Sequence, residues 1–289
     1  MTGRGLILAA PASGSGKTLV TAGLARHLRR CGLRVATAKA GPDFIDPTFH
    51  DAAAGQACLN LDVWGMREAT LAALVGELET CADIVLCEGV MGLFDGTGPE
   101  GTVGSTAELA RVTGWPVVLI VDARGQSSSV AALLRGFATH DPLVTPAGVI
   151  FNRVSSGRHG ALLVGATARH LPYLVRLGTL PADPGLVLPS RHLGLVPAGE
   201  NGDTDAVIER CADHIGASID VERLLRLPRC SVLTAAARAV PVPPLGQRIA
   251  VARDQAFCFA YPALLEGWRS GGAELAFFSP LASGTSPVT

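Results

Sequence analysis

One short segment constrains the fold of this chain more than any other, a glycine-rich loop between an apolar run and an amphipathic stretch. The run Leu6–Ala10 leads into P-A-S-G-S-G-K-T at residues 11–18, and the helix-like stretch Lys17–Arg30 follows at once. Backbone N–H groups of such a loop surround phosphate oxygens, and the next helix adds its positive end. We therefore predict a buried strand, a phosphate-binding loop and a helix, the start of an α/β nucleotide-binding fold.

Individual residues of the glycine loop have distinct chemical roles. Gly14 and Gly16 let the backbone approach a phosphate closely, Lys17 reaches the outer phosphates, and the Thr18 hydroxyl can bind Mg²⁺. Pro11 stands where such loops usually carry Gly, and an ordinary turn rich in Gly and Ser is the alternative. The predicted nucleotide-binding residues are Ser13, Gly14, Ser15, Gly16, Lys17, Thr18 and, from a later strand, Asn152.

Lysine is rare in this sequence. Lys and Arg together number 24, yet Lys17 and Lys39 are the only lysines. Lysine offers a compact ammonium on a flexible stem, whereas arginine offers a planar fork. Because both lysines fall inside recognisable motifs, we infer that these positions need the ammonium. Chance survival of two lysines during drift toward arginine is the alternative.

Composition excludes several classes of protein. The net charge is -1 and its acidic and basic residues are interspersed, so we expect neither a nucleic-acid nor a membrane partner. No apolar run approaches the roughly 20 residues of a membrane-spanning helix. The seven cysteines include no C-x-x-C pair, which argues against a disulfide framework and a structural zinc site. We expect a soluble cytoplasmic protein, and a homodimer is compatible with the sequence.

Short apolar runs alternate with amphipathic stretches along the chain. With 48% hydrophobic and 17% charged residues, this pattern is typical of a parallel sheet covered by helices. We predict an α/β fold of the P-loop NTPase type, with a mostly parallel sheet and helices on both faces. The predicted strands are Leu6–Ala10, Arg34–Lys39, Ala82–Cys87, Pro116–Asp122 and Ala147–Asn152, and the predicted helices are Lys17–Arg30, Arg67–Leu78, Ser128–Thr139, His159–Leu171 and Asp203–Leu227.

A Pro-rich segment divides the chain. V-P-V-P-P-L-G at residues 240–246 is typical of an extended linker. We predict a nucleotide-binding domain at 1–235, a linker at 236–247 and the beginning of a second α/β domain at 248–289. The last unit is too small to be an independent domain, which indicates a domain that is cut short. Its predicted strand, helix and strand are Arg248–Asp254, Pro262–Ser270 and Gly272–Ser279.

The second lysine opens a segment rich in acids and turn residues, K-A-G-P-D-F-I-D at residues 39–46. In open parallel sheets, ligands bind at the carboxyl ends of the strands. Acids near a polyphosphate are unfavourable unless Mg²⁺ lies between them. We therefore predict that Asp43 reaches the metal and that Asp46 faces what lies beyond the phosphates. Turn and cap chemistry is the alternative for both acids.

Two further segments carry polar residues at the ends of predicted strands. C-E-G-V-M-G-L-F-D-G occupies residues 87–96, and Glu88 is predicted to bind Mg²⁺ or a metal-bound water. Asp95 and Phe94 are predicted to lie toward the second substrate. Asn152 could read the adenine edge with its amide, and an Asx-turn is the alternative. The predicted substrate-binding residues are Phe44, Asp46, Phe94, Asp95 and, as a group at the edge of the site, His192.

Five segments together resemble the cobyrinate and hydrogenobyrinate a,c-diamide synthases of vitamin B12 biosynthesis. They are A-P-A-S-G-S-G-K-T, K-A-G-P-D-F-I-D-P-T-F-H, C-E-G-V-M-G-L-F-D-G, R-H-L-G-L and R-I-A-V-A-R-D-Q-A-F-C-F, and they span nearly the whole chain. The second and third are highly specific to this family. The broader relatives, dethiobiotin synthetase and cobyric acid synthase, share the glycine loop, the lysine and the acid after the third strand. Ser190 departs from the family, whose members usually carry an acid there.

The resemblance implies a dethiobiotin synthetase-like fold and an ATP-dependent ligase that amidates the a- and c-acetate carboxylates of a corrinoid acid. It also implies that a C-terminal class I amidotransferase domain supplies ammonia from glutamine. Our own hypothesis for the reaction is an acyl phosphate intermediate, with Mg²⁺ as cofactor. The amidotransferase Cys–His pair lies beyond the end of this chain in family members, so we expect no glutamine-dependent activity. From the residues themselves, we predict Lys39, Asp46 and Asp95 as catalytic residues and Thr18, Asp43 and Glu88 as metal ligands.

Other hypotheses stay open at this point. A ligase like cobyric acid synthase is the nearest alternative, and an inactive remnant is another. A partner-switching P-loop ATPase is a hypothesis of a different class, but that group carries a lysine early in the loop, where this chain has Ala12. Stimulation of ATP hydrolysis by a corrinoid acid with ammonia would favour the ligase, and stimulation by DNA or lipid would favour the switch.

Overall fold

The computed structural model describes residues 3–188, 190–191, 194–198, 203–234 and 242–282. Its centre is a seven-stranded sheet with the order β3-β2-β4-β1-β5-β6-β7, and its neighbouring strands all pair in parallel. This confirms the predicted parallel sheet. The strands are β1 (Arg4–Ala9), β2 (Val35–Ala40), β3 (Leu59–Leu61), β4 (Ile84–Glu88), β5 (Val117–Asp122), β6 (Pro146–Val154) and β7 (Val175–Pro181).

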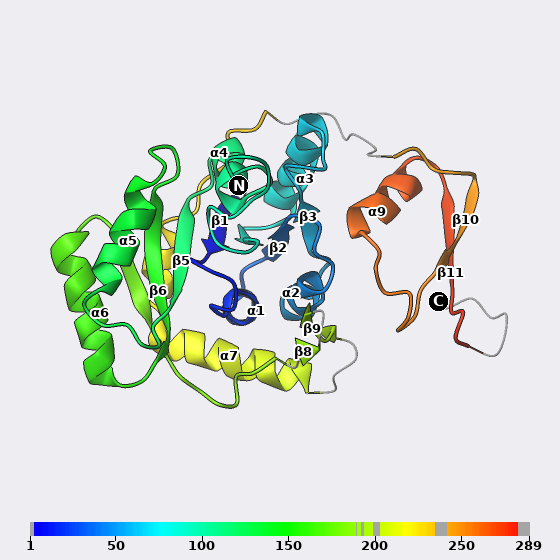
Figure 1. The fold of residues 1–289 in the computed structure, drawn as a ribbon. Helices are drawn as coiled ribbons and strands as arrows, with labels where there is room; N and C mark the ends of the chain where they lie inside the picture. Colours follow the sequence, from blue (N-terminus) through cyan, green and yellow to red (C-terminus); the bar gives the residue numbers. More distant parts are fainter. Residues whose placement is uncertain (1–2, 189, 192–193, 199–202, 235–241, 283–289) are drawn as a thin grey trace.

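Helices cover both faces of the sheet (Figure 1). Side chains alternate between the two faces along a strand. Leu6 and Leu8 of β1 belong to the apolar cluster formed with α1, α2 and α7, whereas Ile7 and Ala9 belong to the cluster formed with α3 to α6. The helices are α1 (Lys17–Arg30), α2 (Asp46–Ala54), α3 (Glu68–Cys81), α4 (Thr106–Thr113), α5 (Val130–Thr139), α6 (Gly157–His170), α7 (Thr204–Ser218) and α8 (Val221–Leu225).

The single helix predicted at Asp203–Leu227 is wrong, because the chain forms α7 and α8 there. Ile219, between them, has extended backbone with φ -111° and ψ 133° and forms a bridge with Gly178 of β7. Asp220 then accepts the Arg223 N–H at 3.0 Å. An Asp that caps the N–H three residues on favours a new helix start over continuation of the old helix.

Some elements have no counterpart in the predictions, among them α2, β3 and α4. β3 has three residues, too few to show an alternating pattern. The start of α4 did carry a signal, the spacing S-T-A-E. The Ser105 hydroxyl accepts the Glu108 N–H at 3.1 Å, and the Glu108 carboxylate accepts the Gly104 N–H at 2.6 Å. Together these contacts resemble a capping box.

The last described stretch forms a small strand–helix–strand unit of β10 (Arg248–Ala252), α9 (Pro262–Ser270) and β11 (Glu274–Phe278), whose strands pair in parallel. Figure 1 shows it beside α2, α3 and β3. The ring centroids of Phe259 and Phe44 lie 3.9 Å apart, and the Tyr261 hydroxyl donates to the Pro42 carbonyl at 2.9 Å. This unit therefore touches the loop after β2.

Two smaller points complete the fold. A short antiparallel pair, β8 (Ser190–Arg191) and β9 (Gly194–Leu195), precedes α7. Much of the predicted linker, residues 235–241, lies outside the described residues. None of the helices in the described ranges is both long enough and apolar enough to cross a membrane.

Candidate active site

Three strands end at the same place in the sheet. β2, β4 and β1 are adjacent, and in the ladder Lys39 of β2 lies beside Glu88 of β4, which lies beside Leu8 of β1. The glycine loop follows β1 directly. Because parallel strands share one carboxyl edge, the structure brings the loop, the second lysine and the acid together there.

The glycine loop has the backbone that close approach to an anion requires. Gly14 and Gly16 have φ values of 77° and 90°, in the left-handed region that glycine enters without penalty. A Cβ on Gly16 would collide with the Asn152 side chain, whereas the same position on Gly14 faces open space. The Ser15 hydroxyl donates to the Ala12 carbonyl at 2.8 Å and closes the turn.

Lys17 reaches from the loop to the segment after β4. Its Nζ donates to the Met91 carbonyl at 2.5 Å. Burial lowers the pKa of this amine, although the nearby Glu88 carboxylate acts in the opposite direction. Met91 has a φ of 47°, a left-handed backbone that costs a residue with a side chain about 1 kcal/mol. The carbonyl oxygen that accepts the Lys17 hydrogen bond therefore belongs to a residue with strained backbone, Met91.

Lys39 lies among three carboxylates and is only 2% exposed. Its Nζ is 2.6 Å from Asp46 Oδ2, 3.3 Å from Glu88 Oε1 and 3.9 Å from Asp43 Oδ2. Burial alone would lower the pKa of this amine, but Glu88 and Asp46 outweigh burial and raise it. Lys39 therefore stays charged and compensates the acids around it.

Glu88 is 1% exposed, and its two oxygens have separate partners. Oε1 accepts the Thr18 hydroxyl at 2.8 Å and lies near Lys39, whereas Oε2 lies 2.6 Å from His50 Nε2. Burial would raise the pKa of this carboxyl, but Lys39 and the hydrogen bonds from His50 and Thr18 lower it to about 2. The Glu88 carboxylate is thus ionised.

The two acids of the loop after β2 differ in environment. Asp43 Oδ1 accepts the backbone N–H groups of Ile45 at 2.8 Å and Asp46 at 3.3 Å, which is the turn chemistry considered as an alternative. Burial, followed by the charge of Glu88, raises the pKa of Asp46 to about 6, against the lowering effect of Lys39. Asp46 can therefore change its protonation near neutral pH.

Asn152 faces the glycine loop, where its Nδ2 donates to the Ser15 carbonyl at 2.9 Å. The next residue, Arg153, has a φ of 58° and donates from Nη1 to the Gly14 carbonyl at 2.7 Å. In the described part of the chain, the non-glycine residues with positive φ are Arg153 and Met91. Both contact the glycine loop, as expected where strain gathers at a functional site, and sequence reasoning missed both.

The predicted substrate-binding residues do not all converge. Phe44 packs on Phe259 of the last unit. Phe94 packs on α5, with its ring centroid 5.6 Å from that of Phe137. Asp95 is exposed, and its Oδ2 accepts the Gly92 N–H at 2.9 Å. One further predicted residue, His192, lies outside the described residues.

Two buried polar residues near the site were missed by sequence reasoning. His50 of α2 contacts Glu88, as described above. The Asn60 Nδ2 donates to the carbonyls of Gly41 at 2.9 Å and Asp43 at 2.6 Å, and so holds the loop after β2. Both residues were missed because they lie on α2 and β3, two elements that the sequence did not predict. His50 does close the motif K-A-G-P-D-F-I-D-P-T-F-H, which was its only sequence signal.

The donors present fit magnesium bound together with a nucleotide. No group of three or more His, Cys, Asp or Glu side chains in the described ranges is arranged to hold a metal ion. Thr18, in the first turn of α1, and Glu88, at the end of β4, nonetheless offer a hydroxyl and an ionised carboxylate 2.8 Å apart. Magnesium is commonly held by one or two carboxylates, several waters and substrate phosphates.

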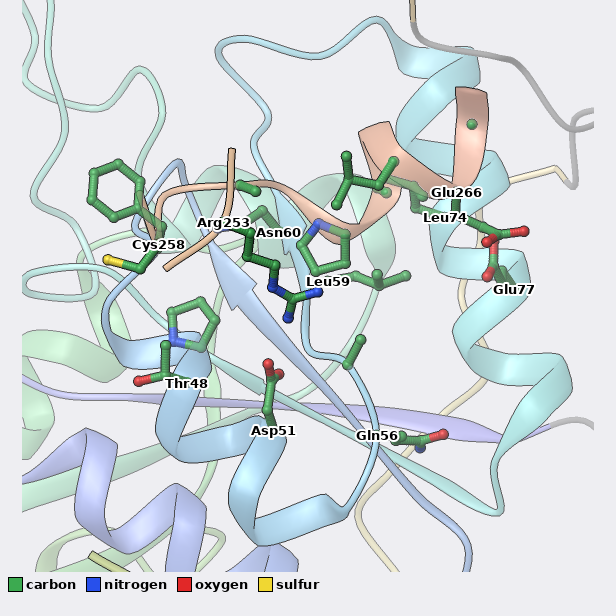
Figure 2. A pocket seen from close by; sticks show the side chains of 18 of the residues that line it. Thr48, Asp51, Gln56, Leu59, Asn60, Leu74, Glu77, Arg253, Cys258 and Glu266 are labelled. Carbon is green, nitrogen blue, oxygen red and sulfur yellow. The ribbon is translucent and has the colours of Figure 1, made fainter. Parts of the chain in front are cut away.

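Two hollows flank this region. One of about 660 Å³ is lined by residues 11–15 of the glycine loop and by residues 121–122 and 124–126 at and after the end of β5. A larger cavity of about 800 Å³ lies between α2, β3, α3 and the last unit. Figure 2 shows Arg253 of the last unit opposite Asp51 of α2 across this cavity. The described residues that line it do not include Lys17 or Lys39, so the larger cavity is separate from the lysine site.

The fold and the site define a P-loop nucleotide-binding protein of the α/β class. Residues 6–196 match the family model described as CobQ/CobB/MinD/ParA nucleotide binding domain. The chain belongs to this family.

Among curated proteins, the chain is similar to the hydrogenobyrinate a,c-diamide synthases of several bacteria. Identity is 52% over 285 residues with that of Brucella suis biovar 1, covering 96% of this chain and 64% of the relative. It is 50% over 279 residues with that of Rhizobium meliloti, covering 96% and 63%. The resemblance stated from the motifs is confirmed, and the chain spans somewhat less than two thirds of the length of these relatives.

Solved structures show weaker similarity. The septum site-determining protein MinD of Pyrococcus horikoshii OT3, complexed with Mg-ADP, has a TM-score of 0.40 and 17% identity over 78% of this chain and 99% of its own. The hydrogenase maturation factor HypB of Archaeoglobus fulgidus has a TM-score of 0.40 and 15% identity, and the match covers 62% of this chain and 81% of HypB. At such scores these similarities add nothing to the conclusions about the site.

Proposed function

We propose that this chain carries the ATP-dependent, carboxylate-activating part of a hydrogenobyrinate a,c-diamide synthase. The observation that carries the proposal is the cluster of buried Lys39 and Glu88 with partly buried Asp46, beside Lys17 of a glycine loop. The relatives supply the substrate class, because their printed name specifies hydrogenobyrinate. Hydrogenobyrinate is therefore preferred over the cobalt-containing cobyrinate as the first substrate to test.

In the first proposed step, an oxygen of a peripheral acetate carboxylate attacks the γ-phosphorus of ATP. The bond to the β-phosphate oxygen breaks, ADP leaves, and an acyl phosphate forms. Both reactants are negative, so the barrier is largely charge repulsion, and positioning with cationic shielding lowers it. Lys17 and Lys39 supply this shielding, and Lys17 would exchange the Met91 carbonyl for a phosphate oxygen.

Magnesium, when bound, would offset the charge of the β- and γ-phosphates. Thr18 and Glu88 are the residues proposed to hold it. Asp43 is proposed to reach the metal through a water, since its Oδ1 already accepts two backbone N–H groups. An adenine contact by Asn152 stays a proposal, and it would require the amide to leave the Ser15 carbonyl.

In the second proposed step, ammonia attacks the acyl carbon, the C–O bond to the phosphoryl group breaks, and inorganic phosphate leaves. The attacking nitrogen must lose one proton. Asp46 is suited to accept it, because a carboxylate with a pKa of about 6 is ionised yet appreciably basic at neutral pH. Asp95 is proposed to orient ammonia or the ring side chain from the exposed segment after β4.

The test is amidation of hydrogenobyrinic acid by the purified chain with MgATP and ammonium. We expect one ADP per amide formed and no ADP above background without the corrinoid. A parallel reaction with glutamine in place of ammonium identifies the nitrogen donor. A parallel reaction with cobyrinic acid shows whether a cobalt-containing ring is accepted. ADP formation that ignores the corrinoid but responds to DNA or lipid would contradict the proposal.

A further inference from the structure

The two oxygens of Glu88 are divided between two tasks. Oε1 accepts the Thr18 hydroxyl at 2.8 Å and lies 3.3 Å from the Lys39 amine. Oε2 lies 2.6 Å from His50 Nε2. His50 is fully buried on α2. Oε1 therefore contacts residues of the proposed site, and Oε2 contacts a histidine of α2.

The chemistry of the contact fixes which atom donates. An ionised carboxylate only accepts hydrogen bonds, so the hydrogen lies on His50 Nε2. The opposite nitrogen, Nδ1, is buried without a hydrogen-bond partner among the described residues. Within the described residues, the hydrogen bond to Glu88 is therefore the one that the His50 ring makes.

We propose that His50 is a positioning residue, which fixes the Glu88 carboxylate so that Oε1 faces the first turn of α1. The inference rests on the proposed function only for the metal-binding role of Glu88. Metal-binding side chains are commonly oriented by a hydrogen bond from a neighbour, and losing that neighbour typically weakens metal affinity about 10- to 100-fold. Here the neighbour donates to the oxygen that does not face Thr18.

The chain offers a matched control. His214 of α7 likewise has its Nε2 beside an acid, 3.1 Å from Asp183 Oδ2, and its Nδ1 is also buried without a partner in the described ranges. Asp183 and His214 belong to no part of the proposed site. A substitution at His214 therefore reports what losing a similar contact does to the fold alone.

The experiment compares two amides of different reach at His50. The amide nitrogen of His50→Gln can occupy the place of Nε2, whereas that of His50→Asn stops near Nδ1. Binding of a fluorescent ADP analogue to the 289-residue chain is titrated with Mg²⁺ and repeated in EDTA. No corrinoid is present, so a failure of the proposed amidation and a failure of this inference are distinguishable. Thermal melting verifies folding.

We expect His50→Asn to need roughly 10-fold more Mg²⁺ for the same gain in nucleotide affinity. We expect His50→Gln and His214→Asn to match the unsubstituted chain, and all variants to bind alike in EDTA. Wild-type Mg²⁺ dependence in His50→Asn, or equal losses in both His50 amides, would overturn the proposal. If His50→Asn does not fold, His50→Gln still tests the proposal, because a loss of Mg²⁺ dependence in that folded variant would refute it.

Discussion

The amine of Lys39 lies 3.3 Å from Oε1 of Glu88, and the two residues sit side by side on adjacent strands. Both are almost fully buried. A buried ion pair is costly unless further hydrogen bonds satisfy its remaining donors and acceptors, and Thr18, His50 and Asp46 supply those bonds. The carboxyl edge of the sheet therefore holds a compact set of ionised groups that packing alone does not explain.

Replacing Lys39 with Arg should lower the amidation rate by at least about 100-fold, while the nucleotide still binds. The planar fork cannot occupy a site built around a compact ammonium among three carboxylates. Initial rates with ammonium and equilibrium binding of ATP separate the two effects. Arg34→Lys, at the exposed pair with Asp83, is the control and should be neutral. A fully active Lys39→Arg enzyme would contradict the inference that this position needs an ammonium.

The amidation rate should depend on the ionisation of Asp46. Burial and Glu88 raise its pKa to about 6, so the carboxylate that accepts a proton is present above this pH and lost below it. We expect the rate at a fixed concentration of free ammonia to fall as the pH drops through 6. Asp46→Asn should be slower at pH 7.5 and lack this decline, and an unchanged pH profile in the variant would argue against the role.

The two glycines with left-handed backbone should respond differently to alanine. Gly14→Ala meets only open space, so the strain of positive φ, about 1 kcal/mol, should weaken nucleotide binding roughly fivefold. Gly16→Ala also collides with Asn152 and should weaken binding by a further factor of about 10. Calorimetric titration with ADP measures both variants. Equal losses would show that Asn152 does not constrain the loop.

The last unit should restrain the loop that carries Asp43 and Asp46. Removing the ring in Phe259→Ala deletes its contact with the Phe44 ring, an interaction of about 1 kcal/mol. Amide hydrogen exchange of residues 43–46 should therefore accelerate roughly fivefold. Phe257→Ala is the control, because Phe257 is a neighbouring, half-exposed ring of the same unit. Equal exchange in the two variants would mean that the contact does not order the loop.

Local patterns made much of the sheet and the charged centre of the site predictable. A strand, a glycine loop and a helix are adjacent in sequence, and the acids after β2 and β4 follow apolar runs, so topology alone brings them together. The contact of His50 with Glu88 was not predictable in this way, because Glu88 lies on another element. In addition, α2 begins in a segment whose residues are typical of a turn. Phe94 shows the same limit, since its packing partner Phe137 belongs to a later helix.

Transfer of oxygen from substrate to phosphate tests the central claim most directly. Hydrogenobyrinic acid labelled with ¹⁸O in its acetate carboxylates is amidated with ATP and ammonium, and the inorganic phosphate is examined by mass spectrometry. Activation as an acyl phosphate predicts one ¹⁸O in phosphate for each amide formed, because the carboxylate oxygen that attacked ATP leaves with the phosphoryl group. Amide formation with unlabelled phosphate would contradict the account.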